Sequence, residues 1–385
     1  MEQVKNQPFG LLPQALVEEL LGQCDDVGKE LIKNIQEVRD SKEKYRHQLQ
    51  HAGLLKKFSD LPDANIPTTC GVDGSYVVER LMATDLVACA AVAIEGLVPP
   101  IEKRFWDTIR HELFIDAVPH NPDTTVVVQG VSWEMEIILA SKAPHDVVFI
   151  DGSITNPFGK LNAALNAAYD NENKSFKGTK IKGTLTKKFE DFLVAYHQIL
   201  SSTRSDKLWI GCPKYTSLRE IGSDLHWPES YDDRAMLTSV LNAGEYTHPK
   251  PYAMANYDWH IVLKDSLKQD HLEDKLKDVY KAINRLHIIY YKPHSYIPAI
   301  RLEVPQSVAT NLYQMKMLLQ AVEFQTRTPG IMEPYPLYMA DRIVKNLSSG
   351  IPAFRQTVTN SMAQSLEGDL SDIFFTMHSY RTENG

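Results

Sequence analysis

The sequence predicts an α/β protein, a mixed β-sheet flanked by helices with a helical N-terminal extension. Short apolar, β-branched segments alternate with segments of helical periodicity along most of the chain. Two strand-like segments also follow one another directly near residues 70–98. The alternation favours helices packed on the faces of a sheet, and the adjacent strands favour a mixed sheet.

Composition and net charge exclude two classes of protein. Of the 385 residues, 43% are hydrophobic and 23% are charged, which excludes disorder over most of the chain. The 41 basic and 49 acidic residues give a net charge of −8. A histone-like cationic coat for nucleic acid is therefore excluded, because such proteins need a surplus of Lys and Arg to neutralise phosphates.

Cysteine usage and hydropathy predict a cytoplasmic protein without a membrane anchor. The four cysteines are scattered and form neither a zinc-finger pair nor a disulfide framework. The first ten residues lack the apolar core of a signal peptide. The longest apolar region, Leu81 to Pro100, is interrupted by Asp85 and Glu95 and indicates a protein core.

Residues 1–62 are expected to form the helical extension and to contact a second copy or a partner. Their leucines recur at helical spacing, and the composition changes at Pro62–Pro67. Residues 63–350 are expected to form the main domain, with a loop-rich insertion at about 155–205. Residues 351–385 are expected to pack on the core or to be partly mobile.

Within the main domain, each element is expected from its own pattern. Residues 101–118 suit a helix or a variable excursion, and 124–130 suit a short strand or the lead-in to a helix. The asparagine-, glycine- and lysine-rich residues 155–182 suit loops. Strands are expected at 69–80, 85–98, 145–153, 207–214, 286–293 and 297–305, and helices at 131–142, 184–201, 234–244, 274–286, 306–325 and 336–348.

The two Asp-Gly steps of the chain both stand in an Asp-Gly-Ser sequence that follows apolar strand residues. They are Asp73-Gly74-Ser75 and Asp151-Gly152-Ser153. One such step alone favours a tight turn. Two in the same frame favour carboxylates fixed at strand ends, which side by side form a hard-oxygen site for Mg²⁺ or Mn²⁺.

A third acid is expected from the helix that precedes the second strand. Glu134 and Glu136 are the candidates, and because they are two residues apart they point to different sides of a helix. The spacing alone leaves the choice between them open.

Five segments in order resemble the NurA family of nucleases over roughly residues 69–350. They are GVDGS near position 70, VVFIDGS ending at Ser153, DDRAMLTSVLNAGEYTHP at 232–249, AIRLEVP ending at Pro305, and PYPLYMADR ending at Arg342. The resemblance implies an RNase H-like fold and Mn²⁺- or Mg²⁺-dependent DNA hydrolysis. It also implies a homodimer that acts with a HerA-type hexameric ATPase.

The resemblance assigns the site residue by residue. Asp73 and Asp151 match the two strand aspartates, Glu134 or Glu136 matches the helix glutamate, and Asp341 matches a late acidic or histidine position. The metal ligands expected are Asp73, Asp151, Glu134 and Asp341, around two ions roughly 4 Å apart. Where some relatives have a tyrosine, this chain has Glu333, with Tyr335 nearby.

Contacts with DNA are expected from Lys214, Arg234 and Tyr335. Lys214 follows a buried strand and can reach a phosphate, although a solvated surface charge is the commoner role of a lone lysine. Arg234 and Arg301 can also contact phosphates, although ion pairs within the protein are the commoner role of such arginines.

The function expected is 5′–3′ exonuclease or single-strand endonuclease activity with a HerA-type ATPase, in DNA end processing or anti-phage defence. One alternative is a non-catalytic subunit that assembles with the ATPase and regulates it. Another is an actin- or sugar-kinase-like phosphotransferase, which needs two glycine-rich phosphate loops where residues 70–160 supply one glycine per turn.

Overall fold

The computed structural model describes residue 10 and residues 12–82, 84–170, 174–252, 261, 270–365 and 370–377. The first and last residues of the chain, 1–9 and 378–385, lie outside the described residues, as do 366–369. What was expected of the N-terminal extension and of the C-terminal segment is therefore seen only in part.

In the described part of the chain, ten strands form one mixed sheet. Their order is β1-β7-β9-β10-β6-β5-β2-β3-β4, and β8 pairs with β9. Strands β2, β5 and β6 run parallel to one another, and the other pairs are antiparallel. The strands are β1 Leu55–Lys57, β2 Thr69–Arg80, β3 Thr84–Glu95, β4 Arg110–Pro119, β5 Val147–Asp151, β6 Leu208–Cys212, β7 Glu245–Thr247, β8 Lys250–Pro251, β9 His287–Lys292 and β10 Ile300–Val304.

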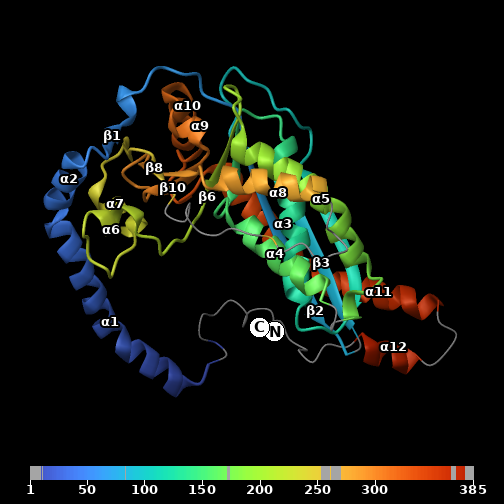
Figure 1. Ribbon diagram of the computed structural model, residues 1–385. Coiled ribbons are helices and arrows are strands. Elements are labelled where there is room, and N and C mark those ends of the chain that lie inside the picture. Colours follow the sequence, from blue (N-terminus) through green and yellow to red (C-terminus); the bar gives the residue numbers. More distant parts are fainter. Residues whose placement is uncertain are drawn as a thin grey trace.

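The helices confirm an α/β architecture with helices around the sheet (Figure 1). They are α1 Gln14–Asp40, α2 Lys42–His51, α3 Thr124–Lys142, α4 Asn156–Ala168, α5 Lys180–Ser201, α6 Glu220–Asp224, α7 Asp233–Val240, α8 Asp270–Ile283, α9 Gln306–Ala309, α10 Leu312–Gln325, α11 Tyr335–Ser365 and α12 Leu370–Thr376, with short 3₁₀ turns at Phe58–Asp60 and Lys174–Phe176.

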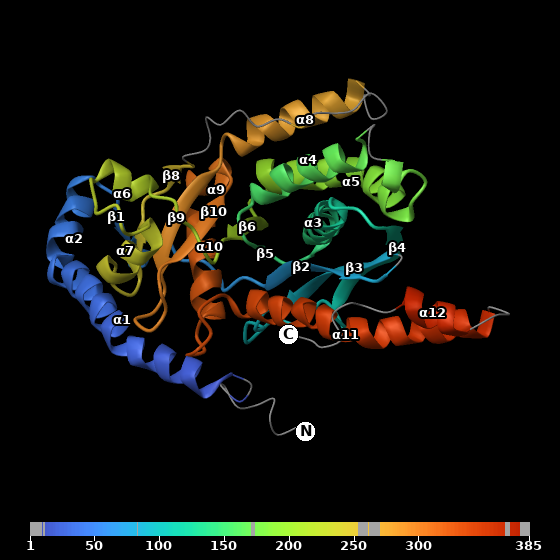
Figure 2. The same ribbon diagram turned by 90° about the horizontal axis from the view of Figure 1, so that it is seen from below.

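Helices cover both faces of the central strands. α3 packs on β2 and β3 from one side, and α11 packs on the same strands from the other (Figure 2). α4 and α5 cover the outer side of α3, and α8 packs on α5. Because α3 is enclosed, most of its side chains between Val127 and Ala140 are buried, including those of Glu134 and Glu136.

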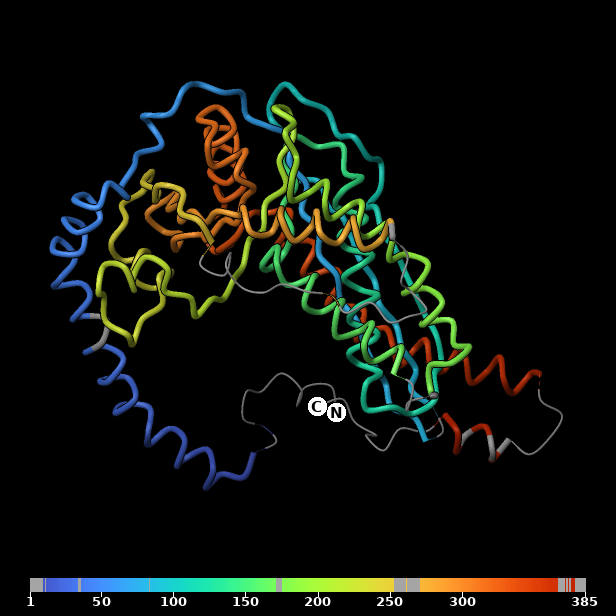
Figure 3. Tube along the Cα trace, in the orientation of Figure 1, coloured from blue at the N-terminus to red at the C-terminus, as the bar shows by residue number. Residues whose placement is uncertain are grey.

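At the other end of the molecule, α1 leaves the body as a long single helix (Figure 3). Its leucine-rich stripe is largely exposed, with Leu20 46% and Leu31 57% accessible. α2 returns to the body, where Tyr45 packs edge-on against Trp227 of the segment between α6 and α7.

Several local expectations were wrong. Residues 110–119 form the edge strand β4. Of the two alternatives for residues 124–130, the lead-in to a helix is confirmed, because these residues form the first turns of α3. Residues 156–168, expected as loop, form α4, because Phe158, Leu161 and Leu165 make a buried stripe among polar residues. The last expected helix continues from Tyr335 to Ser365 through Pro352.

A glycine lets α11 approach the sheet. A Cβ atom at Gly71 of β2 would lie 2.5 Å from the backbone nitrogen of Leu337, in the first turn of α11. Only a residue without a side chain permits this contact. The close approach carries Asp341, one turn further along α11, toward the centre of β2.

We therefore expect Gly71→Ala to destabilise the protein by about 1–3 kcal/mol, because α11 must move away from β2. Urea denaturation measures the change. Gly350→Ala, within α11 itself and with nothing within 4 Å of the added Cβ, is the matched control. It should be neutral or should stabilise by up to roughly 1 kcal/mol. Equal stability of Gly71→Ala and wild type would contradict the close contact.

Candidate metal centre

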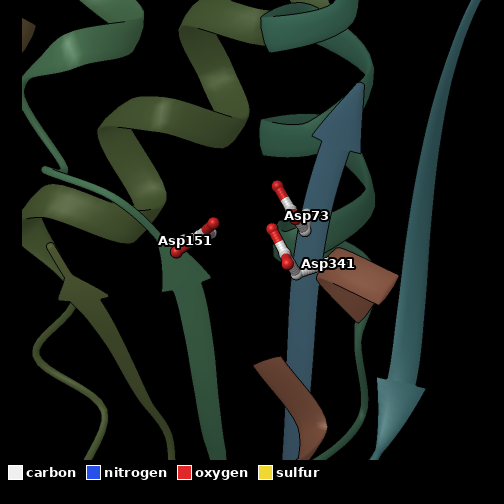
Figure 4. Close-up of side chains that lie close together, drawn as sticks. All are labelled: Asp73, Asp151 and Asp341. Carbon is white, nitrogen blue, oxygen red and sulfur yellow. The ribbon is translucent and has the colours of Figure 1, made fainter. Parts of the chain in front are cut away.

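Three aspartates from distant parts of the chain meet beside the central strands. Asp73 lies within β2, Asp151 ends β5, and Asp341 lies on α11. One carboxylate oxygen of each lies within 4.8 Å of the others, and the side chains approach a common space (Figure 4). The arrangement provides hard oxygen ligands of the kind that Mg²⁺ and Mn²⁺ prefer.

Strand register explains why the two Asp-Gly-Ser sequences meet. β2 and β5 are parallel, and Val72 pairs with Ile150. Asp73 and Asp151 are the next residues on their strands. The two Asp-Gly-Ser sequences therefore lie side by side in the sheet.

Lys214 supplies a positive charge within this cluster. Its Nζ lies 3.2 Å from Oδ2 of Asp151, 3.2 Å from Oε2 of Glu333 and 3.3 Å from Oδ1 of Asp341. Burial opposes the charged amine, but the three carboxylates outweigh burial and raise the pKa of Lys214. The lysine thus remains protonated and balances part of the negative charge that a metal ion would otherwise balance.

The carboxyl groups respond to burial and to one another. Burial, followed by the charge of Asp151, raises the pKa of Asp73 to about 8. Burial also raises the pKa of Asp151 and of Glu333, although Lys214 counteracts part of the effect. Burial alone would raise the pKa of Asp341 too, but Lys345 and Lys214 lower it below its usual value.

The structure distinguishes the two helix glutamates. Burial and the charges of Asp73 and Asp151 raise the pKa of Glu136 well above its usual range. Oε2 of Glu136 would lie 2.9 Å from a Cβ at Gly74, so that glycine makes room for this carboxylate beside Asp73. Oε1 of Glu136 has no hydrogen-bond partner among the described residues.

Glu134, expected among the metal ligands, faces elsewhere. Burial raises its pKa, and the charge that acts on it is that of Lys188 on α5. The charges of Asp73 and Asp151 raise the pKa of Glu136 but are not among the causes of the raised pKa of Glu134. The expectation that Glu134 is a metal ligand was therefore wrong. Residues two apart on a helix point to different sides, and only Glu136 faces β2 and β5.

A buried charge network holds the turn after Asp151. Oε2 of Glu303 accepts hydrogen bonds from Oγ of Ser153 at 2.7 Å and from the backbone nitrogen of Ile154 at 3.0 Å. Arg301 donates from Nε to Oε1 of Glu303 at 3.1 Å and pairs through both Nη atoms with Glu220 at 2.8 Å. Each buried charge is therefore paired and hydrogen-bonded, as burial requires.

The role of Glu303 was not predicted from the sequence. Of the two roles considered for Arg301, the ion pair within the protein is the one that the structure shows. Arg301 is fully buried and acts within the protein. The signal lay in the RLEVP sequence, where two opposite charges two residues apart on a buried strand must share one face and pair there.

The remaining candidates lie around the cluster. Arg234 donates from Nε to the carbonyl oxygen of Ala299 at 3.1 Å and lines a cavity next to Lys214. Tyr335 is the first residue of α11.

Comparison with known proteins identifies similar chains. The sequence model of the NurA domain matches residues 67–345. The NurA nuclease from Sulfolobus solfataricus is similar in structure, with a TM-score of 0.60 and 13% identity over 92% of this chain and 99% of that chain. NurA with manganese has a TM-score of 0.52 and 14% identity over 90% and 99%. NurA bound to dAMP and manganese has a TM-score of 0.50 and 14% identity over 84% and 93%.

These structures share the fold of this chain. The search of curated proteins gave no match. Among the described residues, none of the helices is long and apolar enough to cross a membrane.

The raised pKa of Asp73 predicts a pH dependence of stability without metal. Its pKa is about 8 in the folded chain against an ordinary value of 3.8. The folded state therefore binds the proton more tightly, and the stability that this group contributes is complete below pH 3.8 and is lost as pH rises through about 8. In EDTA, the free energy of unfolding should fall across this window, and Asp73→Asn should flatten the fall.

The control is Asp206→Asn. Asp206 is an exposed carboxylate whose pKa is lowered by its hydrogen bond from Arg204, so it titrates below this window. Urea denaturation at a series of pH values should give the wild-type slope for this variant. A wild-type slope in Asp73→Asn would show that the proton on Asp73 is not what makes stability depend on pH.

Proposed function

The chain belongs to the NurA domain family, and we propose that it is a nuclease that hydrolyses DNA with Mn²⁺ or Mg²⁺. The observation that carries the proposal is the meeting of Asp73, Asp151 and Asp341 within 4.8 Å. Relatives that carry manganese share the fold of this chain, which supports the choice of metal.

The residues present fit a divalent cation. The amine of Lys214 already serves as a cation for Asp151, Glu333 and Asp341, and the carboxylate of Asp73 lies within 4.8 Å of two of them, Asp151 and Asp341. Oε1 of Glu136 is a buried oxygen without a partner in the described chain and is available as a further ligand. Bound ions, two per site in this proposal, would activate water and stabilise the leaving oxygen.

The chain itself positions the groups for this chemistry. Asp73 and Asp151 are held by paired parallel strands, and Asp341 is held by the contact of α11 with Gly71. With a divalent cation held by the carboxylates, the amine of Lys214 would be available to bind an oxygen of the DNA phosphate. Arg234, on the same side of the site, provides a second cation for the strand.

Assembly forms a second part of the proposal. We propose that the protein is a homodimer that acts with a HerA-type hexameric ATPase in DNA end processing or anti-phage defence. The exposed stripe of α1, with Leu16, Leu20, Val27 and Leu31 between 46% and 57% accessible, supports burial of this helix against another chain. A chain of net charge −8 also attracts DNA weakly, so a motor that delivers the strand suits it.

Asp73→Asn and Asp151→Asn should each lower Mn²⁺-dependent cleavage of linear DNA by at least about 100-fold. Loss of a residue that only supports a metal ligand costs about 10–100-fold, and loss of a ligand should cost no less. Glu136→Gln should also lose activity, whereas Glu134→Gln, an isosteric change on the same helix, should keep it. End-labelled duplex and single strands in Mn²⁺, Mg²⁺ and EDTA provide the assay.

Cleavage that survives in both aspartate variants would refute the proposed site. A wild-type protein that is inert with every metal, yet is required for assembly of the ATPase, would show a non-catalytic subunit instead.

The dimer is tested by sedimentation velocity. A Leu20→Glu, Leu31→Glu double variant should shift the protein from dimer to monomer, because it places charge on the exposed stripe of α1. Lys33→Glu, which changes the charge of the same helix without altering the leucine stripe, is the control. A double variant that sediments as wild type would place the contact elsewhere, and co-purification with the ATPase tests the second partner.

A further inference from the structure

The segment Pro213–Leu218 follows β6 directly at the metal centre and lies between two cavities. The first cavity, of about 790 Å³, is lined by Asp151 and Lys160. The second, of about 590 Å³, is lined by Asp232 and Arg234. Lys214, Tyr215, Thr216 and Ser217 line both cavities, so this segment is their common wall.

Tyr215 stands on that wall almost entirely in solvent. Its accessible fraction is 94%, whereas Tyr313 and Tyr296, the other exposed tyrosines of the described chain, are 47% and 44% accessible. A tyrosine normally buries much of its ring against the protein, and one that does not is free to present a face to a ligand. An open aromatic face next to a phosphate-binding lysine is the feature on which nucleobases stack.

The charges and volumes of the cavities fit a nucleic acid strand. Lys160 lines the first cavity and Arg234 the second, and Lys214 stands between them. Arg301 and Glu303, which also line the first cavity, are engaged in the buried charge network with Glu220. Both volumes fall within the range of roughly 300–1,000 Å³ that is typical of ligand pockets.

We propose that Tyr215 is the stacking residue for a single strand that passes from one cavity to the other across Pro213–Leu218. A base stacks on the Tyr215 ring, and the adjoining phosphate lies against Lys214 beside Asp151. This proposal rests on the proposed nuclease function for the identity of the strand. Tyr215 would select single strands, because a base within a duplex is already stacked on its neighbours and offers no free face.

The test measures binding rather than cleavage. In Ca²⁺, a divalent cation that also takes carboxylate ligands, the affinity for a fluorescein-labelled single strand should fall by about tenfold or more in Tyr215→Ala, as expected when one base loses its aromatic partner. Tyr215→Phe and Tyr215→Trp keep an aromatic face and should bind within about twofold of wild type. Tyr313→Ala, on α10 and outside the lining of both cavities, is the control for loss of an exposed tyrosine and should bind as wild type.

A strand with 2-aminopurine provides a direct signal of stacking. Fluorescence of this base should be quenched on binding to wild type and to Tyr215→Phe, but not to Tyr215→Ala. Because Tyr215 is exposed, its replacement leaves the core intact, and circular dichroism should show an unchanged fold.

Wild-type affinity in Tyr215→Ala, an equal loss in Tyr215→Phe, or a wild type that binds no single strand would each overturn the proposal. A Tyr215-dependent affinity in a protein that cleaves nothing would overturn the proposed nuclease function alone. If cleavage depends on Asp73 but the affinity for a single strand is the same with and without the Tyr215 side chain, the stacking role alone would be overturned.

Discussion

The crowding of carboxylates around a single lysine is the constraint on which the rest of the structure depends. Asp151, Asp341 and Glu333 each lie within 3.3 Å of the Lys214 amine, and Asp73 and Glu136 lie beside them. Burial disfavours the charged carboxylates and like charges repel one another, and these two effects, burial first, raise the pKa of Asp73. Part of the stability gained in the core is thus offset at the place where a divalent cation would relieve the repulsion.

The fold tolerates this cost because three independent features fix the acids. Parallel pairing of β2 with β5 aligns Asp73 and Asp151, and the missing side chain at Gly71 admits α11 with Asp341. Glu303 then holds the turn after Asp151 through Ser153 and Ile154. None of these contacts involves the acids' own oxygens, so the carboxylates are positioned and still available to a ligand.

The sequence showed which strands carry the aspartates. Both Asp-Gly-Ser sequences follow apolar strand residues, and two parallel neighbouring strands bring their aspartates side by side. The sequence could not decide between Glu134 and Glu136, since the choice depends on the rotation of α3 against the sheet. Glu303 was missed for a similar reason, as its partners Ser153 and Ile154 are about 150 residues away along the chain. α4 and β4 were missed because polar composition masked a buried helix stripe in one and a half-exposed edge strand in the other.

We propose that Asp73, Asp151 and Asp341 bind a divalent ion in place of the Lys214 amine. Anomalous diffraction from crystals soaked in Mn²⁺ tests this most directly, because it locates manganese without reference to activity. We expect an anomalous peak between the three aspartates and a Lys214 amine that has moved away from Asp151 and Asp341. No peak at this position, with Lys214 still in contact with those carboxylates, would contradict it.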